Sequence, residues 1–145
     1  MSKKHYPEMH TAEHMLNQAM VSKFGCNRCF SAHINKKKSK CDYHFERALT
    51  SLEIIELNDS INRQIKKDLP IIIKMVSKED AQRRYKIDRV PDQEALKQIR
   101  IVSIGDYDVC PCAGLHVNST REIGQFKITT TGFEGGVLRI RFKLL

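Results

Sequence analysis

Residues 10–24 read HTAEHMLNQAMVSKF, and Gly25 follows them. Apolar side chains recur along this stretch every three or four residues, the spacing that places them on one face of an α-helix. A glycine directly after such a stretch is a common helix C-cap, because glycine adopts the left-handed conformation without strain. The sequence therefore predicts a helix over residues 10–24. Its apolar face consists of Ala12, Met15, Leu16, Ala19, Met20 and Phe24.

Two histidines, His10 and His14, lie four residues apart at the start of this helix. That spacing puts both imidazoles on one side of the helix, one turn apart, where they can bind a single metal ion. Two histidines on a helix edge also occur by chance. The pair alone leaves both interpretations open.

Beyond this helix the chain carries two strand patterns and a second helix. The strands are predicted over Cys29–Ile34 and Cys41–Glu46, joined by a lysine-rich turn. Thr50 and Glu53 have the spacing of a capping box, which opens a helix that continues to about Asp68.

The second half of the chain is richer in strands. After Pro70, the run Ile71–Val76 predicts a buried strand, and Ser77 is the expected N-cap of a short helix that ends at Arg84. Asp92–Gln98 predicts one more helical turn. Three further strands are expected over residues 99–104, 125–130 and 137–144. This order predicts an α+β fold, a two-layer sandwich with helices on one face of a largely antiparallel sheet, in one domain over residues 1–145.

The composition is that of an ordinary globular domain. The chain has 145 residues, of which 41% are hydrophobic and 29% charged, enough for one domain with a single core. No apolar run approaches the ~20 residues that a membrane-spanning helix needs. The N-terminus lacks the apolar segment of a signal peptide. We therefore expect a cytoplasmic protein that is not bound to a membrane.

The formal net charge of +8 favours a polyanionic partner, because neutralising phosphates releases condensed counterions. The charge is clustered in a lysine turn (Lys36, Lys37, Lys38 and Lys40) and along one strand (Arg139, Arg141 and Lys143). Aromatic residues are few, so extensive base stacking is not expected. Both clusters are candidate nucleic-acid contacts, and an ordinary solvated face is the alternative for each.

Five cysteines, an odd number, argue against a complete disulfide framework. Metal binding is therefore the first explanation to test. In the stretch CPCAGLH at residues 110–116, Cys112 and His116 lie four residues apart in a turn of small residues. Together with His10 and His14 they would supply three nitrogens and one sulfur, a tetrahedral donor set that Zn²⁺ accepts. Such a site is either catalytic, with one ligand yielding to substrate, or closed and structural.

The remaining thiols allow a different site. Cys26 and Cys29 form a C-x-x-C motif that could join Cys110 and Cys112 in a four-sulfur metal site, although the second pair is spaced more tightly than usual. A redox role for the motif is less well supported, because the motif does not open a helix after a strand.

Three motifs carry a resemblance to a known family. HTAEHML at residues 10–16, CAGLHV at 112–117 and STREIGQFKI at 119–128 resemble the editing domain shared by alanyl- and threonyl-tRNA synthetases. The resemblance extends from about His10 to the C-terminus. Because no catalytic synthetase domain accompanies it, the chain is similar to the free-standing AlaX-type trans-editing proteins.

The resemblance implies a function and a set of ligands. The activity would be hydrolysis of the ester that joins a wrong amino acid to the 3′ adenosine of tRNA, most often in Ser-tRNA(Ala) or Gly-tRNA(Ala). The acceptor end of the mischarged tRNA would be the partner. The cofactor would be Zn²⁺, held by residues matching His10, His14, Cys112 and His116.

Ser31 resembles the position at which a hydroxyl residue of the family recognises the serine side chain, and an ordinary strand serine is the alternative. Because side chains alternate along a strand, His33 shares the face of Ser31, so we predict that His33 approaches the same pocket. Cys110 stands where many relatives carry an acidic or amide group. It is a third candidate catalytic residue. Glu13 is a candidate base, with a solvent-facing glutamate as the alternative.

The turn itself departs from the family pattern. Ala113 and Leu115 occupy its variable positions, so the turn does not decide between tRNA(Ala) and tRNA(Thr). Editing of Ser-tRNA(Thr) stays open for that reason. A tRNA-binding module with a structural zinc ion and a zinc hydrolase of small esters are two further alternatives.

Overall fold

The structure is a computed structural model that describes residues 6–85, 90 and 96–145. In chain order its elements are α2 (Pro7–Phe24), β1 (Ser31–His33), β2 (Ser39–His44), α3 (Ser51–Lys66), β3 (Ile71–Ser77), α4 (Lys78–Arg84), β4 (Gln98–Ile104), β5 (Asp108–Pro111), the 3₁₀ turn η2 (Thr120–Ile123), β6 (Phe126–Glu134) and β7 (Val137–Leu144). No helix in this part of the chain is both long enough and apolar enough to cross a membrane.

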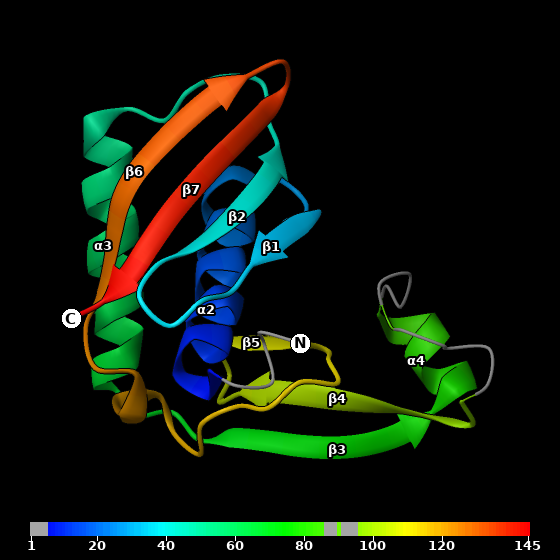
Figure 1. Cartoon of the computed structure of the whole chain (residues 1–145). Coiled ribbons are helices and arrows are strands. Elements are labelled where there is room, and N and C mark those ends of the chain that lie inside the picture. The colour runs from blue at the N-terminus through cyan, green and yellow to red at the C-terminus, as the bar shows by residue number, and fades with distance from the viewer. Residues whose placement is uncertain (1–5, 86–89, 91–95) are drawn as a thin grey trace.

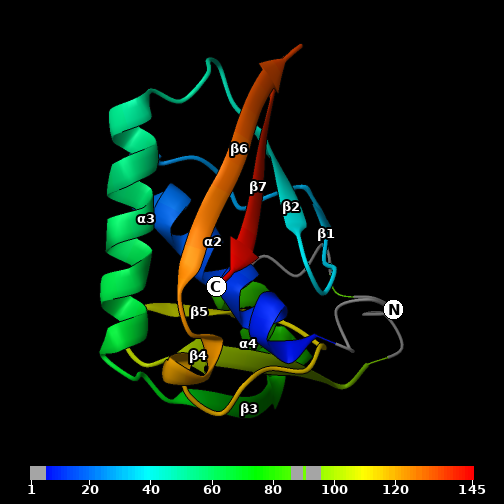
Figure 2. The same cartoon turned by 60° about the vertical axis from the view of Figure 1, so that its left-hand side comes forward.

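The main body has two layers. Strands β1-β2-β7-β6 form a four-stranded antiparallel sheet in that order, and α2 and α3 pack on one of its faces (Figures 1 and 2). The core lies between the layers, and its largest fully buried side chains include Tyr43, Phe126 and Phe142. The predicted α+β class, with helices on one face of an antiparallel sheet, is confirmed.

The helices begin and end near the predicted residues. α2 starts three residues earlier than expected, at Pro7, because proline fits the first turn of a helix, where its missing N–H costs nothing. The helix ends at Gly25, which has a positive φ of 68°. α3 opens with the predicted capping box, in which Thr50 accepts a hydrogen bond from the Glu53 backbone N–H and the Glu53 carboxylate accepts one from the Thr50 N–H.

A second, three-stranded antiparallel sheet with the order β3-β4-β5 projects from the base of the main body, and α4 lies at its far end (Figure 1). Strand β5 was not predicted from the sequence, because its four residues (DVCP) end in proline and do not alternate clearly in polarity. This strand is nevertheless essential to the architecture of the site, because it lies against α2 and carries Asp108 and Cys110.

The predicted strand over residues 71–76 exists, but the prediction that it is buried is wrong. Ile72, Ile73 and Met75 are 46%, 49% and 53% exposed. The reason is that β3 is the edge strand of the projecting sheet and pairs only with β4. Ser77 caps α4 as predicted. Of the helical turn predicted over Asp92–Gln98, residues 92–95 lie outside the described residues, and Gln98 begins β4.

Asn17 joins α2 to the sheet. Its buried Oδ1 accepts hydrogen bonds from the Cys29 backbone N–H at 2.9 Å and from the Tyr43 hydroxyl at 2.9 Å. Both donors belong to buried residues, so this acceptor satisfies two groups that are shielded from water. The joint lies one helical turn beyond His14 and fixes the position of the helix that carries both histidines.

We predict that Asn17→Ala lowers the free energy of unfolding by about 2–4 kcal/mol, because it leaves two buried donors without their acceptor. Urea unfolding followed by circular dichroism measures the change. The neighbouring substitution Gln18→Ala, at a half-buried position, is the control and should cost less than about 1 kcal/mol. An equal loss in the free energy of unfolding for the two variants would show that the Asn17 hydrogen bonds do not stabilise the packing of α2 on the sheet.

Candidate metal centre

The four residues proposed as metal ligands lie together. His10 and His14 project from α2, and Cys112 and His116 come from the loop that follows β5. Their candidate ligand atoms all lie within 4.8 Å of one another. The three imidazole ring centroids are 4.1 to 4.9 Å apart. Two stretches about a hundred residues apart in sequence thus form one cluster.

The outer nitrogens of His10 and His116 are already hydrogen-bonded. His10 Nδ1 lies 2.9 Å from the Leu115 carbonyl oxygen, so it must be the protonated nitrogen that donates. Thr11 donates its hydroxyl proton to the Pro7 carbonyl at 3.0 Å, so at 2.9 Å it can only accept from His116 Nδ1. Because Nδ1 holds the proton in both rings, Nε2 carries the free lone pair.

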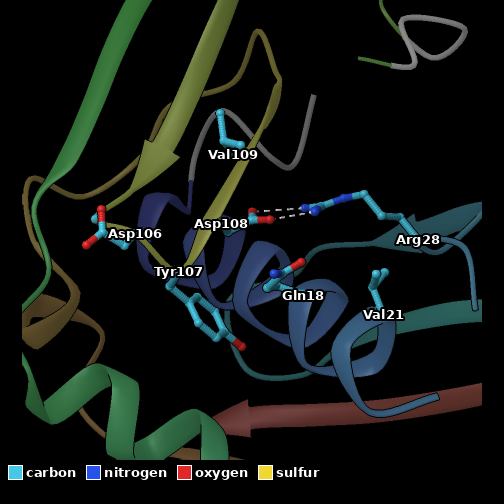
Figure 3. Close-up of a pocket in the computed structure, with 8 residues that line it drawn as sticks. Gln18, Val21, Arg28, Asp106, Tyr107, Asp108 and Val109 are labelled. Carbon is cyan, nitrogen blue, oxygen red and sulfur yellow. Dashed lines mark hydrogen bonds and ion pairs between the residues drawn. The ribbon is translucent and has the colours of Figure 1, made fainter. Parts of the chain in front are cut away.

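His14 is oriented in the same way by polar groups of β5. Its Nδ1 lies 3.3 Å from the Cys110 sulfur and 3.7 Å from Asp108 Oδ2. Asp108 is itself held by Arg28, whose two terminal nitrogens donate to the two carboxylate oxygens at 2.8 and 3.2 Å (Figure 3). Such a carboxylate behind a histidine fixes the ring and its tautomer in many metal sites.

Burial alone would raise the pKa of Asp108. Its contacts with His14 and Arg28 nevertheless hold that pKa below its usual value. Burial lowers the pKa of His14, but the neighbouring Cys110, Asp108 and Cys112 outweigh burial and raise it well above its usual value. Burial and the other two imidazoles lower the pKa of His116 to about 4, so this ring is neutral at pH 7.

Cys112 supplies the negative charge of the cluster. Its sulfur lies 3.3 Å from His10 Nε2. Although burial raises its pKa, the proximity of the three imidazoles lowers that pKa to about 2. The thiolate form is therefore favoured, and the thiolate is the form that binds a metal. A thiolate beside a protonated imidazole is the charge arrangement that a metal cation would replace.

The loop from Cys112 to His116 approaches α2 more closely than most residues would allow. A Cβ at Gly114 would lie 2.3 Å from His10 Cε1, so only glycine fits there. Arg100 of β4 holds the loop in place by donating to the carbonyl oxygens of Cys112 and Gly114 at 2.9 and 2.7 Å. No role for Arg100, Arg28 or Asp108 was predicted from the sequence, because each acts through tertiary contacts that local spacing does not indicate.

These residues fit a bound metal ion. The buried Nε2 of His116 has no hydrogen-bond partner among the described residues, although it lies within the cluster. A buried ring nitrogen of this kind needs a partner, and a metal ion would supply it. Three imidazole nitrogens and one thiolate form a donor set that Zn²⁺ accepts in tetrahedral geometry.

Two of the other candidate residues lie beside this cluster. Cys110 is buried behind His14 at the Nδ1 side, so it contacts the outer edge of a ligand rather than the metal-facing side. Glu13 is 2% exposed, which rules out the solvent-facing interpretation. Its Oε1 lies 3.8 Å from His10 Nε2, and its Oε2 accepts from the Cys29 thiol at 3.5 Å.

The structure does not bring Ser31 and His33 to the cluster. Residues that pair directly across antiparallel strands point to the same face of the sheet. Ser31 pairs with Asp42 and His33 with Lys40, whereas Ala32 pairs with the buried Cys41, which faces α2. Ser31 and His33 therefore lie on the outer face of the sheet, away from the helix layer. Alternation was predicted correctly, but the sequence did not reveal which face covers the helices.

The four-sulfur alternative does not form. Cys29 lies with Glu13 and Cys41, Cys110 with His14, and Cys112 with the three histidines. All five cysteines are free. The C-x-x-C motif is thus separated from the other two thiols.

A cavity of about 360 Å³ lies beside the Arg28–Asp108 pair. Its lining comes from α2 and from the turn that leads into β5, and Tyr107 closes one side by donating its hydroxyl to the Met15 carbonyl at 2.7 Å (Figure 3). The four clustered residues do not line it, so the metal centre and this cavity are separate features.

Comparison with known proteins gives consistent matches. Residues 99–141 match the family described as "Threonyl and Alanyl tRNA synthetase second additional domain". The chain is 31% identical over 134 residues to an alanine–tRNA ligase of Shouchella clausii, covering 90% of this chain and 15% of that protein. It is 32% identical over 131 residues to the alanyl-tRNA editing protein AlaX-L of Pyrococcus horikoshii, covering 83% and 29%. The chain therefore spans less than a third of either relative.

We predict that Gly114→Ala weakens Zn²⁺ binding at least about tenfold, because the added methyl group collides with His10 and displaces one ligand. Calorimetric titration of the metal-free protein measures the affinity. Gly132→Ala is the matched control, because a Cβ at that position meets nothing within 4 Å. Wild-type affinity in the Gly114 variant would show that His10 is not a ligand.

Proposed function

Because this chain belongs to the threonyl- and alanyl-tRNA synthetase second additional domain family, we propose that it is an aminoacyl-tRNA deacylase that clears mischarged tRNA. Its main substrate is Ser-tRNA(Ala), with Gly-tRNA(Ala) as a second substrate. The observation that carries the proposal is the convergence of His10, His14, Cys112 and His116 in a chain similar to an alanyl-tRNA editing protein. The reaction belongs where translation takes place, which fits the predicted cytoplasmic location.

The four clustered residues would hold Zn²⁺. A bound zinc ion supplies Lewis-acid chemistry, by lowering the pKa of water or by anchoring the amino group of the substrate. Cys112 and His116 are half-buried, whereas His10 and His14 are almost fully buried. Substrate therefore approaches from the side of the 112–116 loop, at whose rim Leu115 is exposed.

Glu13 is the candidate that accepts a proton in this reaction. It lies on the same side of α2 as His10 and His14, and its carboxylate is 3.8 Å from His10 Nε2. A carboxylate at this distance from the metal-facing nitrogen is within reach of a substrate or a water molecule at the centre. Cys110 is better suited to positioning His14, since it lies on the far side of that ring.

Asp108 supports the proposal because it provides the acidic group that the family resemblance implies near His14. The family resemblance places an acidic or amide group at the position of Cys110. In this chain Asp108, two residues earlier on the same face of β5, brings a carboxylate to His14 Nδ1. An acidic group thus still lies behind the proposed ligand His14, although it comes from residue 108 and not from residue 110. Arg28 holds this carboxylate in place.

We predict that Cys112→Ala and His10→Ala each lower the rate of Ser-tRNA(Ala) deacylation by about 100-fold or more, because each removes a metal ligand. Release of labelled serine measures the rate. His44→Ala is the control and should keep the wild-type rate, since His44 is exposed and stacks on Phe30.

The same assay separates the alternatives. Faster hydrolysis of Ser-tRNA(Thr) than of Ser-tRNA(Ala) would show that the main substrate is Ser-tRNA(Thr). Tight binding of tRNA without any deacylation would contradict the proposal and favour a binding module. Hydrolysis of small aminoacyl esters without preference for tRNA would favour a different hydrolase.

The sequence-based prediction that Ser31 selects serine conflicts with the position of Ser31 on the outer face of the sheet, and it has its own test. If a hydroxyl partner in the pocket recognised serine, the ratio of hydrolysis rates for Ser-tRNA(Ala) and Ala-tRNA(Ala) could reach several orders of magnitude. Because Ser31 shares its face with Asp42, we expect Ser31→Ala to change the preference for Ser-tRNA(Ala) over Ala-tRNA(Ala) by less than about threefold. A loss of preference of about tenfold or more would place Ser31 in the pocket and contradict the register observed here.

A further inference from the structure

The outer face of the four-stranded sheet carries like charges in direct opposition. Lys127 of β6 pairs with Lys143 of β7, and Lys40 of β2 pairs with Arg141 of β7. Directly opposed like charges destabilise a sheet. An arrangement that costs stability points to an anionic partner that offsets it. We name Lys40, Lys127, Arg141 and Lys143 the basic sheet face.

The charges of this face are only partly neutralised within the protein. Asp42 is held by Arg139, which donates to both carboxylate oxygens at 2.8 and 3.0 Å, and by Lys40 at 3.4 Å. Arg139, although predicted as a nucleic-acid contact, is therefore already paired. Among the described residues no ion pair joins Lys127, Arg141 or Lys143 to a carboxylate.

The basic sheet face lies at the end of the sheet nearest to the metal centre. β2 and β6 begin at this end and β7 ends there, as the pairs Ser39–Phe142 and Phe126–Leu144 show. The Ser39 hydroxyl contacts the Met9 sulfur at 3.4 Å, and Met9 precedes the ligand His10. The exposed lysine turn (Lys36, Lys37 and Lys38) directly precedes Ser39, so it lies at the same end of the sheet.

We propose that the basic sheet face binds the phosphate backbone of the tRNA acceptor stem, and that the lysine turn guides the 3′ strand around the end of the sheet to the metal centre. This inference rests on the proposed function. The partner is RNA rather than a membrane surface, because the exposed aromatic side chains of the sheet, Phe30 and Phe133, belong to its opposite end. A surface of lysine and arginine without aromatic groups binds phosphates without reading base sequence.

The test measures binding of uncharged tRNA(Ala), so it does not depend on catalysis. We expect the double variant Lys127→Gln/Lys143→Gln to weaken binding about tenfold at physiological salt, and to lower the slope of log Kd against log salt by about 0.7–0.9 for each lysine removed. An isolated acceptor-stem minihelix should show the same losses as whole tRNA. The control Lys66→Gln/Lys67→Gln, at exposed positions around the end of α3, removes equal charge and should leave both quantities unchanged.

Three outcomes of the RNA-binding measurements would overturn the inference. They are unchanged affinity and salt slope in the Lys127/Lys143 variant, an equal loss in the control, and a loss with whole tRNA but not with the minihelix. Binding of anionic lipid vesicles with the same lysine dependence, in place of tRNA, would also overturn it. Because unfolding would mimic a loss of binding, each variant must first show a melting temperature no lower than that of the wild type. Lysine-dependent tRNA binding by a wild-type chain that deacylates nothing would support this surface and contradict only the proposed function.

Discussion

Hydrogen bonds at the outer nitrogens of three histidines determine what this site can bind. The Leu115 carbonyl, the Thr11 hydroxyl and the Cys110–Asp108 pair each occupy one Nδ1, so the three Nε2 atoms turn toward the Cys112 thiolate. Each of these partners depends on a larger element. Arg100 holds the loop that carries Leu115, Arg28 holds Asp108, and Asn17 fixes α2 against the sheet. These three residues thus link the orientation of each histidine ring to the packing of the helix, the strand or the loop that carries its partner.

The parts that could be predicted from sequence are those encoded by local spacing. The four-residue spacing of His10 and His14 and the capping box at Thr50 depend on helical geometry alone, and the structure has both. The match to the editing-domain family was likewise visible in short motifs. Contacts between segments that are distant in the sequence could not be predicted in this way. Nothing near Arg28 in the sequence indicates that it pairs with Asp108, eighty residues away.

The errors also have physical causes. The apolar composition of β3 suggested burial, but a strand at the edge of a small projecting sheet has no layer to cover it. Alternation along β1 was predicted, yet the identity of the inner face depends on the pairing of Ala32 with Cys41 and not on β1 itself. Glu13 is polar and was a candidate for the surface, but it lies on the same side of the helix as two ligands and is buried with them.

We propose that one zinc ion is bound by His10, His14, Cys112 and His116. X-ray absorption at the zinc K-edge of the zinc-loaded protein tests this proposal, because the spectrum counts ligands by element and distance. The expected result is one zinc per chain with three nitrogens at about 2.0–2.1 Å and one sulfur at about 2.3 Å. A shell of two or more sulfurs, or no stoichiometric zinc, would contradict it.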